Sequence, residues 1–487
     1  MTAEGTRASQ GPASALWRGR GLLCCLAGAL ATAPIAAQQP VEGSPAAAYV
    51  AVDADVVVLR DVTVVDGTAG PALRGQTVVI EGNRITSVGP NGEVAIPQGA
   101  EILDLPGHTV MPGMMGLHDH LYYTAAGGRA AQLTYSAPRL YLGSGVTSVR
   151  TTGSQQPYAE LNLKAEIEAG NLPGPRIHIT APYITGGTGA STMTFLNSPE
   201  QARRFVRYWA EEGATWLKAY TNIRSAELGA AIDEAHRHGI KVTGHLCSIS
   251  FTEAVDLGID NIEHGLMTNS DYSPGRGQDE CPQDLMTSTG DVDVNSPEVA
   301  NTFRKMIDAG VPMTSTLAVY ELFFQGRPVR DQRSLDAMAP DVREDYLRSK
   351  AQIDEVGLPV ELLHNAMAYE KAFYDAGGIL AAGVDPTGNG GALPGYGDQR
   401  NYELLVEAGF APEAAVQVLT ANGARVLDVF DDLGTVEAGK IADLVVMQGD
   451  LTADPSVIRN VTLVFKDGVG YDSPKMLDDV RGRVGIS

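Results

Sequence analysis

Four histidines, one lysine and one aspartate stand where short apolar runs of the sequence end. They are His118 and His120 in GLHDH, Lys218 in WLKAY, His245 in VTGH, His264 in NIEHG and Asp385 in AAGVDP. His118 and His120 are two residues apart, so both imidazoles point to the same side of an extended chain. Neutral imidazoles and a carboxylate are ligands that suit Zn²⁺ and similar divalent ions. The pattern therefore predicts a metal site.

Lys218 does not fit such a site as an ammonium ion, because a cation without a lone pair repels a metal ion. A desolvated lysine in a cationic environment has a depressed pKa and becomes nucleophilic. When such an amine adds CO₂, it becomes a carbamate, an anionic oxygen ligand that is able to bridge two metal ions. Our hypothesis is a binuclear centre of two divalent ions, most consistent with zinc, bridged by carboxylated Lys218.

The elements that must position these residues alternate between short apolar or β-branched runs and helical segments. This alternation predicts parallel strands joined by crossover helices. We expect eight strands, at 109–118, 145–150, 176–181, 215–220, 241–245, 259–264, 311–315 and 378–385. Eight such units in about 280 residues predict an α/β fold of the (β/α)8 TIM-barrel type, spanning 109–429, with function at the C-terminal ends of the strands.

Both ends of the chain have a different sequence pattern. Short runs of alternating apolar residues, typical of β-strands, are separated by Asp-Gly or Glu-Gly-Asn turn signals. We expect residues 50–108 and 430–487 to pair into one small β-sandwich domain. Inside the barrel, the stretches 267–295 and 316–361 are longer than ordinary loops, so we expect them to form lids or rims.

The first 37 residues have the pattern of a secretory signal peptide. Arg7, Arg18 and Arg20 precede an apolar run of about a dozen residues, too short to span a bilayer, and small residues follow up to Ala37. We therefore expect an exported protein, periplasmic or extracellular, without membrane attachment after cleavage. The net charge of −23 argues against nucleic acid as a partner. The oligomeric state stays open, and a homo-oligomer is compatible with the sequence.

The motifs VMPGMMGLHDH, WLKAY, VTGH, NIEHG and AAGVDP, together with LGTVEAGKIADLVV near the C-terminus, resemble the amidohydrolase superfamily over roughly residues 55–475. Within it, the chain resembles the imidazolonepropionase-related group, which contains metal-dependent dipeptidases and N-acyl amino acid hydrolases. The KAYTN stretch and the residues around Cys247 also look like bacterial amidohydrolases that cleave the amide of ochratoxin. By this resemblance, His118, His120 and Asp385 would hold the more buried metal, His245 and His264 the other, and Lys218 would bridge them.

The resemblance also implies a mechanism for amide hydrolysis. A metal-bridging hydroxide attacks the scissile carbonyl, and Asp385 takes the proton and passes it to the leaving nitrogen. Tyr220 is a candidate for hydrogen bonding to the substrate carbonyl, and its alternative is an inward-facing tyrosine packed at the rim. Thr188 stands where many relatives carry a histidine that meets the substrate, which weakens any inference of the substrate from those relatives.

Two further assignments concern the loops at the barrel mouth. Cys247 and Cys281 are the only cysteines outside the predicted leader, and export permits a disulfide between them, although two buried free thiols are the alternative. Arg276, Arg327 and Arg400 are candidates for holding a substrate carboxylate because of their loop positions.

The function expected from these residues is hydrolysis, by a secreted metal-dependent amidohydrolase, of amide C–N bonds in dipeptides or N-acyl amino acids, ochratoxin-like compounds included. Hydrolysis of a cyclic amide, such as a lactam or an imidazolone ring, uses the same metals and is the alternative. An inactive binding protein on the same fold is the alternative from another class. Such proteins usually lose metal ligands, whereas this chain keeps all six positions.

Overall fold

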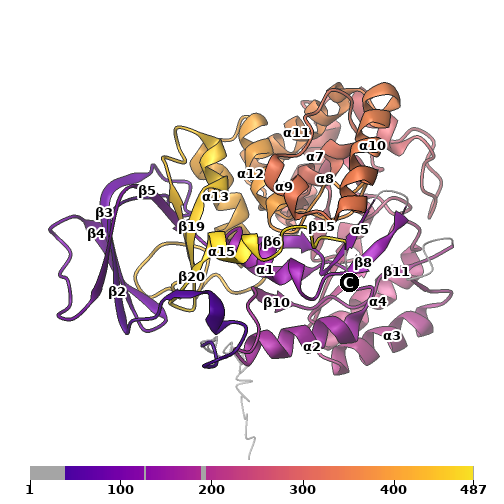
Figure 1. Ribbon diagram of the computed structural model, residues 1–487. Helices are drawn as coiled ribbons and strands as arrows, with labels where there is room; N and C mark the ends of the chain where they lie inside the picture. The colour runs from indigo at the N-terminus through magenta and orange to yellow at the C-terminus, as the bar shows by residue number, and fades with distance from the viewer. Residues whose placement is uncertain (1–38, 126–127, 188–192, 486–487) are drawn as a thin grey trace, which may run out of the picture. The chain divides into compact units, whose positions relative to one another are not determined.

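The computed structural model describes residues 39–125, 128–187 and 193–485 (Figure 1). The predicted signal peptide at 1–37 and the candidate substrate contact Thr188 therefore lie outside the described residues. Among the residues that are described, none of the helices is long and apolar enough to cross a membrane.

Eight parallel strands form the central barrel and confirm the predicted (β/α)8 fold. In order around the barrel they are β6 (Met114–Asp119), β9 (Val146–Thr151), β10 (Arg176–His178), β13 (Trp216–Ala219), β14 (Lys241–Gly244), β15 (Asn261–Glu263), β16 (Met313–Ser315) and β17 (Leu380–Ala382). Between β10 and β13, the Ala181 amide donates to the Trp216 carbonyl at 2.9 Å. Beyond β17, the Asp385 amide donates to the His118 carbonyl at 2.7 Å, which joins the last strand to the first.

Helices lie outside these strands (Figure 1). They are α1 (Ser136–Gly143), α2 (Pro157–Glu168), α3 (Pro199–Glu211), α4 (Ser225–Arg237), α5 (Phe251–Asp256), α7 (Pro297–Asp308), α11 (Val360–Asp375), α12 (Tyr396–Glu407), α13 (Pro412–Leu419) and α14 (Ala421–Val426). Ser198 and Ser296 are N-caps of α3 and α7, since their hydroxyls each accept a backbone N–H at 3.3 Å. Proline follows each of these serines at the first helical position, where its missing N–H has no cost.

The first predicted strand, at 109–118, is divided in the structure. Residues up to Pro112 belong to β5 (Glu101–Pro112) of the terminal sheet, and the barrel strand β6 begins only at Met114. Gly113 separates the two strands, and a Cβ atom at this position would lie 2.2 Å from the Thr147 hydroxyl. The close approach requires glycine where the chain leaves one sheet for the other, a break that the apolar run did not reveal.

The two ends of the chain form one mixed eight-stranded sheet in the order β1-β20-β19-β18-β5-β2-β3-β4. Besides β5, its strands are β1 (Val50–Val52), β2 (Val56–Val64), β3 (Leu73–Glu81), β4 (Arg84–Pro90), β18 (Leu444–Gln448), β19 (Val461–Lys466) and β20 (Val469–Asp472). Val52 and Ile85, from the two opposite edges, share one hydrophobic cluster with Phe465. The sheet therefore curls around its own core, which confirms the small β domain that was expected from both chain ends.

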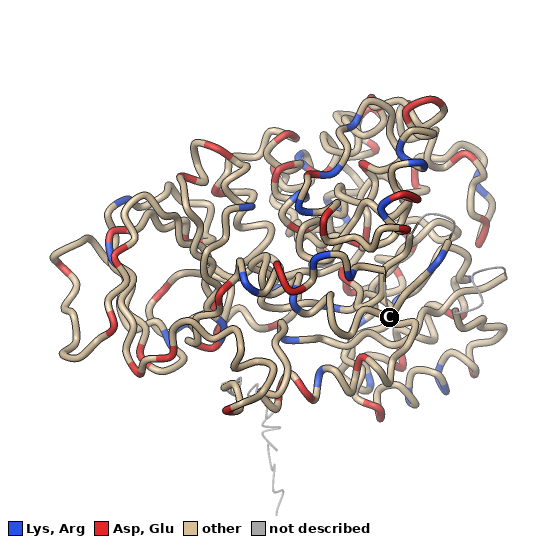
Figure 2. The backbone as a smooth tube through the Cα atoms, viewed as in Figure 1, with Lys and Arg blue, Asp and Glu red and all other residues tan. Residues whose placement is uncertain are grey.

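The two long stretches carry additional helical segments. The first contains η3 (Gly265–Thr268), α6 (Leu285–Ser288) and η4 (Thr289–Asp291), and the second contains α8 (Leu317–Tyr320), η5 (Glu321–Phe323), α9 (Gln332–Ala337) and α10 (Pro340–Val356). The remaining short elements are η1 (Ala47–Tyr49), β7 (Tyr122–Thr124), β8 (Ala130–Gln132), β11 (Ile184–Thr185), β12 (Thr194–Phe195), η6 (Pro455–Arg459) and α15 (Ser473–Asp478). Acidic and basic positions are scattered along the backbone of the described residues (Figure 2).

Candidate metal centre and active site

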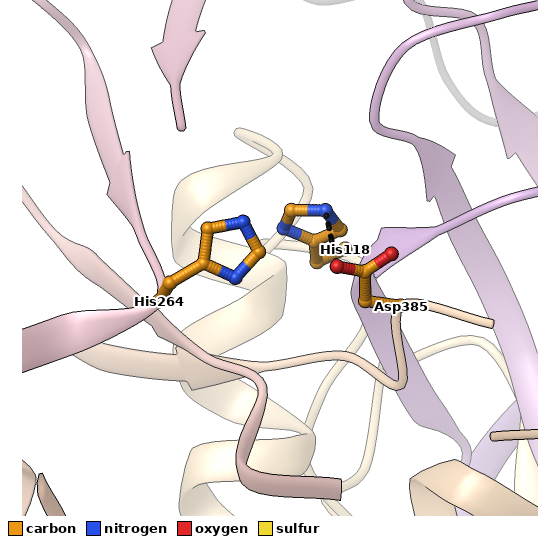
Figure 3. A group of neighbouring side chains, drawn as sticks. All are labelled: His118, His264 and Asp385. Carbon is orange, nitrogen blue, oxygen red and sulfur yellow. Dashed lines mark ion pairs between the residues drawn. The ribbon is translucent and has the colours of Figure 1, made fainter. Parts of the chain in front are cut away.

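A cavity of about 600 Å³ opens over the C-terminal ends of the barrel strands. Five of the six predicted metal-site residues line it, namely His118, His120, Lys218, His245 and Asp385. The sixth, His264, is buried beside them, and one ligand atom from each of His118, His264 and Asp385 lies within 4.8 Å of the others (Figure 3). The fold therefore brings together all six side chains that the sequence placed at strand ends.

His118 lies near the end of β6 and is fixed from behind by a carboxylate. Its Nδ1–H donates to Oε2 of Glu263 at 2.8 Å, which leaves Nε2 directed at Asp385, 3.5 Å from Oδ2. Burial lowers the pKa of His118 to about 4, with an added contribution from the nearby Lys218. The imidazole is therefore neutral at pH 7 and presents an Nε2 lone pair to the centre of the cluster.

His120 is oriented by the backbone instead. Its Nδ1 lies 3.2 Å from the carbonyl oxygen of Gly153, so Nδ1–H donates and Nε2 faces Oδ1 of Asp385, also at 3.2 Å. The Tyr183 hydroxyl lies 3.4 Å from the same Nε2. Asp119, between the two histidines, points into the barrel wall, where its Oδ1 accepts the Val384 amide at 3.0 Å. The alternation of an extended chain thus puts both imidazoles at the cavity, as predicted.

His245 and His264 form the other side of the cluster. Their ring centroids are 4.3 Å apart, and the His264 ring lies 4.4 Å from that of His118. Thr316 holds Nδ1 of His264 at 2.7 Å, and Nε2 of His264 is buried without a hydrogen-bond partner among the described residues. Burial lowers the pKa of His245 to about 3 and that of His264 well below its ordinary range. Both rings are therefore neutral, and each can donate a nitrogen lone pair to a metal ion.

Asp385 follows β17 in the left-handed backbone region, with φ of 48°. This conformation is uncommon for a non-glycine residue and is typical of functional sites. Burial alone would raise the pKa of its carboxyl group, but His118, His120 and Lys218 outweigh burial and hold the pKa well below its usual range. The carboxylate is therefore ionised and accepts the Thr387 hydroxyl at 3.0 Å.

Lys218 lies on β13 and is completely buried. Desolvation lowers its pKa to about 8, although the carboxylates of Glu263 and Asp385 oppose this change. In the part of the chain that the structure describes, no hydrogen bond is made by Nζ. An amine with this pKa exists partly in the neutral, nucleophilic form near pH 8.

This donor set fits divalent metal ions. The imidazoles of His118, His245 and His264 are neutral, and the carboxylate of Asp385 is ionised. Two polar atoms of the cluster, Nε2 of His264 and Nζ of Lys218, lack a protein partner among the described residues. Buried polar atoms without partners are costly, so their clustering indicates a ligand that satisfies them. Within this cluster, His118, His264 and Asp385 place ligand atoms close enough to share one ion.

Glu263 is a site residue that sequence reasoning missed. Its carboxylate accepts from His118, from Nη2 of Arg150 at 2.6 Å and from the Thr243 hydroxyl. Burial would raise the pKa of this carboxyl group, but the positive charges of Lys218 and Arg150 hold it well below its usual range. The available signal was an acidic residue inside a short buried strand, because such a residue requires partners.

Tyrosines surround the cluster on the cavity side. Tyr220, just past Lys218, lines the cavity, its ring centroid 4.6 Å from that of His245, and burial raises its pKa to about 12. The hydroxyls of Tyr122 and Tyr183 are hydrogen-bonded to each other, and Tyr320 lies over His264 at a centroid distance of 5.4 Å. Tyr220 is therefore a neutral hydroxyl at the site, as its candidate role requires.

Cys247 and Cys281 form a disulfide, with Cα atoms 4.9 Å apart. Cys247 lies two residues after His245, and Cys281 lies in the 267–295 stretch, so the bond joins the strand-end loop that carries His245 to a rim segment. Both cysteines line the cavity. The disulfide is thus part of the site wall.

The three arginines that were candidates for a substrate carboxylate do not line the cavity. Arg327 and Arg400 pair with Glu321 at 2.8 and 2.7 Å. Arg276 pairs with Glu253 at 2.7 Å. Arg276 and Arg327 lie in loops as expected, but Arg400 lies in helix α12. All three guanidinium groups are engaged by carboxylates of the scaffold, so the expectation of a substrate role is corrected.

A closed (β/α)8 barrel with imidazoles, a lysine and an aspartate at its C-terminal mouth defines the class of metal-dependent barrel hydrolases. Residues 109–470 match the model of the amidohydrolase family. The chain belongs to the amidohydrolase family and is therefore a hydrolase that acts on carbon–nitrogen bonds.

Individual relatives differ in chemistry. A dihydroorotase from Pelotomaculum thermopropionicum is 31% identical over 420 residues, which cover 82% of this chain and 91% of the relative. Among solved structures, a Bifidobacterium longum protein described as a candidate prolidase has a TM-score of 0.62 and 25% identity, covering 88% of this chain and 99% of its own. Ochratoxinase from A. niger has a TM-score of 0.61 and 17% identity, covering 89% and 100%, and supports the fold alone.

Proposed function

We propose that this protein hydrolyses amide C–N bonds of small molecules with two divalent metal ions, zinc being the best match to the imidazole donors. His118, His120 and Asp385 would hold one ion, and His245 and His264 the other. Lys218 would bridge them as a carbamate, formed when its neutral amine adds CO₂ and releases one proton. The observation that carries this proposal is the convergence of six ligand-type side chains with Nε2 of His264 and Nζ of Lys218 buried without partners among the described residues.

Bound divalent ions supply Lewis acidity to the scissile carbonyl and lower the pKa of a water molecule towards neutrality. The protein side chains supply the proton transfer and the orientation. Asp385, ionised and at the cavity floor, accepts the proton of the attacking water and returns it to the leaving nitrogen. Tyr220, neutral because burial raises its pKa to about 12, donates a hydrogen bond to the carbonyl oxygen as negative charge develops there.

Dipeptides and N-acyl amino acids, ochratoxin-like amides included, are the substrates we propose first. The cavity of about 600 Å³ is large enough for a drug-sized compound. The name of one similar structure, the candidate prolidase at 25% identity, supports a linear amide. Hydrolysis of a cyclic amide is the second candidate, favoured by the dihydroorotase relative that spans most of this chain.

We also propose that the protein is exported, with residues 1–37 removed as a signal peptide. The Cys247–Cys281 disulfide supports this, because structural disulfides are typical of oxidising compartments. Fractionation of cells that express the full chain, followed by intact mass of the mature protein, tests it. A cytosolic chain that retains its N-terminus would contradict export.

The test of the enzymatic proposal is metal content per chain, measured on protein purified without chelator and with bicarbonate present. Two transition-metal equivalents per chain are expected, together with hydrolysis that is lost on metal depletion and restored on reloading. The assay compares a panel of dipeptides and N-acyl amino acids with dihydroorotate and simple lactams. A chain that binds no metal after reconstitution and cleaves neither panel would instead favour the binding-protein alternative.

A further inference from the structure

The wall of the cavity contains almost no positive charge. Lys218 is the single Lys or Arg among the described residues that line it, and Lys218 lies at the floor in the proposed metal centre. The segment 188–192, which the structure does not describe, has the sequence TGAST and carries no charged side chain. A substrate above the metal centre therefore meets no lysine or arginine of the described wall.

The upper wall is apolar with a few neutral polar groups. Met267, Leu285, Met286, Val319 and Phe323 come from the two rim segments and line the cavity. Neutral hydrogen-bonding groups are provided by residues such as Tyr220 and Thr268. These side chains suit an apolar or aromatic body that carries uncharged carbonyl and amide groups.

The guanidinium groups of Arg327 and Arg400 are not free to bind an anionic substrate. Arg327 and Arg400 are held by Glu321, a carboxylate that is 1% exposed, and Arg327 also pairs with Glu407 at 2.7 Å. Turning either arginine towards the cavity would leave Glu321 buried with fewer positive charges, a change that is strongly unfavourable. The ion pairs of the scaffold therefore hold these two guanidinium groups away from the cavity wall.

We propose that this enzyme selects amides whose amine-side portion is uncharged, such as aryl amides and N-acyl amino acids with a carboxamide or ester in place of the free carboxylate. This selection rests on the proposed amide hydrolysis, and among its candidate substrates it ranks neutral amides above dipeptides and N-acyl amino acids that keep a free carboxylate. A free carboxylate entering this wall loses hydration and gains no cationic partner there, whereas a carboxamide of nearly the same shape has a smaller desolvation cost.

A matched pair of substrates tests the selection. Phenylacetyl-L-phenylalanine and its C-terminal carboxamide differ in one negative charge, and chromatography measures the phenylacetate that each releases with the metal-loaded enzyme. We expect kcat/KM to be at least about tenfold higher for the carboxamide. Equal values, or a preference for the free carboxylate, would overturn the proposal.

A binding measurement separates this selection from the proposed hydrolysis. The corresponding benzylsulfonyl compounds are not hydrolysed, so calorimetry with the metal-loaded protein measures the effect of the charge alone. The carboxamide is expected to bind more tightly than the carboxylate. If neither phenylacetyl compound is cleaved, the proposed function fails, and the ratio of the two dissociation constants still decides the selection.

Two substitutions of Gln283, an exposed residue at the cavity entrance, provide a gain-of-function test. Gln283 lines the cavity and is exposed, so a charged side chain is accommodated there without burial. Gln283→Arg is expected to raise the kcat/KM of the carboxylate relative to the carboxamide several-fold, and Gln283→Glu is expected to lower it. A ratio that is the same in both variants and in the parent would count against charge as the determinant.

Discussion

Nδ1 of His118 donates to Oε2 of Glu263 across 2.8 Å, although the two residues are 145 positions apart in the chain. Arg150 donates to the other carboxylate oxygen of Glu263 at 2.6 Å, and its guanidinium lies over the Trp216 ring at 4.4 Å. The orientation of one proposed metal ligand is therefore set by a buried chain of contacts that crosses the barrel interior. Carboxylates that hold ligating histidines in this way raise their basicity and fix their tautomer.

Replacing Glu263 with glutamine tests that role. Glu263→Gln keeps the shape of the side chain but removes the charge that fixes the His118 tautomer, so metal affinity is expected to fall about 10- to 100-fold. Competition with a chelating indicator measures the affinity. Glu160→Gln is the matched control, because Glu160 is also completely buried but is not in the ligand cluster. Equal metal affinity in the two variants would contradict the role of Glu263.

Asp385 has two proposed roles, as a ligand and as the proton-transfer group. Asp385→Asn keeps an oxygen donor but cannot accept the proton, so kcat is expected to fall by about 10²- to 10⁴-fold while much of the metal remains bound. Turnover and metal content are measured on the same preparation. Loss of metal in proportion to activity would show that the aspartate acts only as a ligand.

Lys218 is expected to be needed for the metal centre itself. Lys218→Ala removes the proposed carbamate, an anionic ligand shared by both ions, so metal and activity are expected to be lost together. Native mass spectrometry of the parent should detect the mass of one CO₂ that is lost on acidification. A fully active, metal-loaded Lys218→Ala protein would refute the bridging role.

The residues at strand ends could be predicted because each depends on a local pattern. An apolar run followed by a histidine, lysine or aspartate locates the end of a strand, and the barrel then collects all such ends at one mouth. His118, His245 and Asp385 were found in this way without any knowledge of their spatial neighbours. The alternation of an extended chain was likewise enough to orient His120.

What the sequence did not reveal depends on partners that are distant in the chain. Glu263 is recognisable as a site residue only through Arg150, 113 positions away, and His118. Arg400 looked available for a substrate because nothing local shows that Glu321 holds it, 79 positions away. The strand break at Gly113 depends on the close approach of Thr147. Packing and ion pairing, rather than periodicity, decide these features.

The disulfide between Cys247 and Cys281 is expected to stabilise the rim. It closes a loop of 34 residues, and bonds of this kind typically contribute about 2–4 kcal/mol. Reductant should therefore lower the melting temperature of the parent and increase proteolysis within 267–295, and should have no effect on the Cys247→Ser/Cys281→Ser double variant. Unchanged melting of the parent in reductant would argue against a stabilising bond.

Glu160, in the first turn of α2, is expected to make stability depend on pH. It is completely buried, and desolvation raises its pKa from the ordinary 4.5 to about 8, although the Ser154 side chain partly opposes this. Between pH 4.5 and about pH 8, the Glu160 carboxyl group is protonated in the folded protein and ionised in the unfolded chain. The contribution of Glu160 to the free energy of unfolding is therefore complete below pH 4.5 and decreases as pH rises towards 8.

The Glu160→Gln variant tests this pH dependence. Glutamine does not ionise, so the melting temperature of Glu160→Gln should fall less than that of the parent between pH 5 and pH 8.5, with metal saturating in both. Parallel melting profiles of the two proteins would contradict a raised pKa at this position.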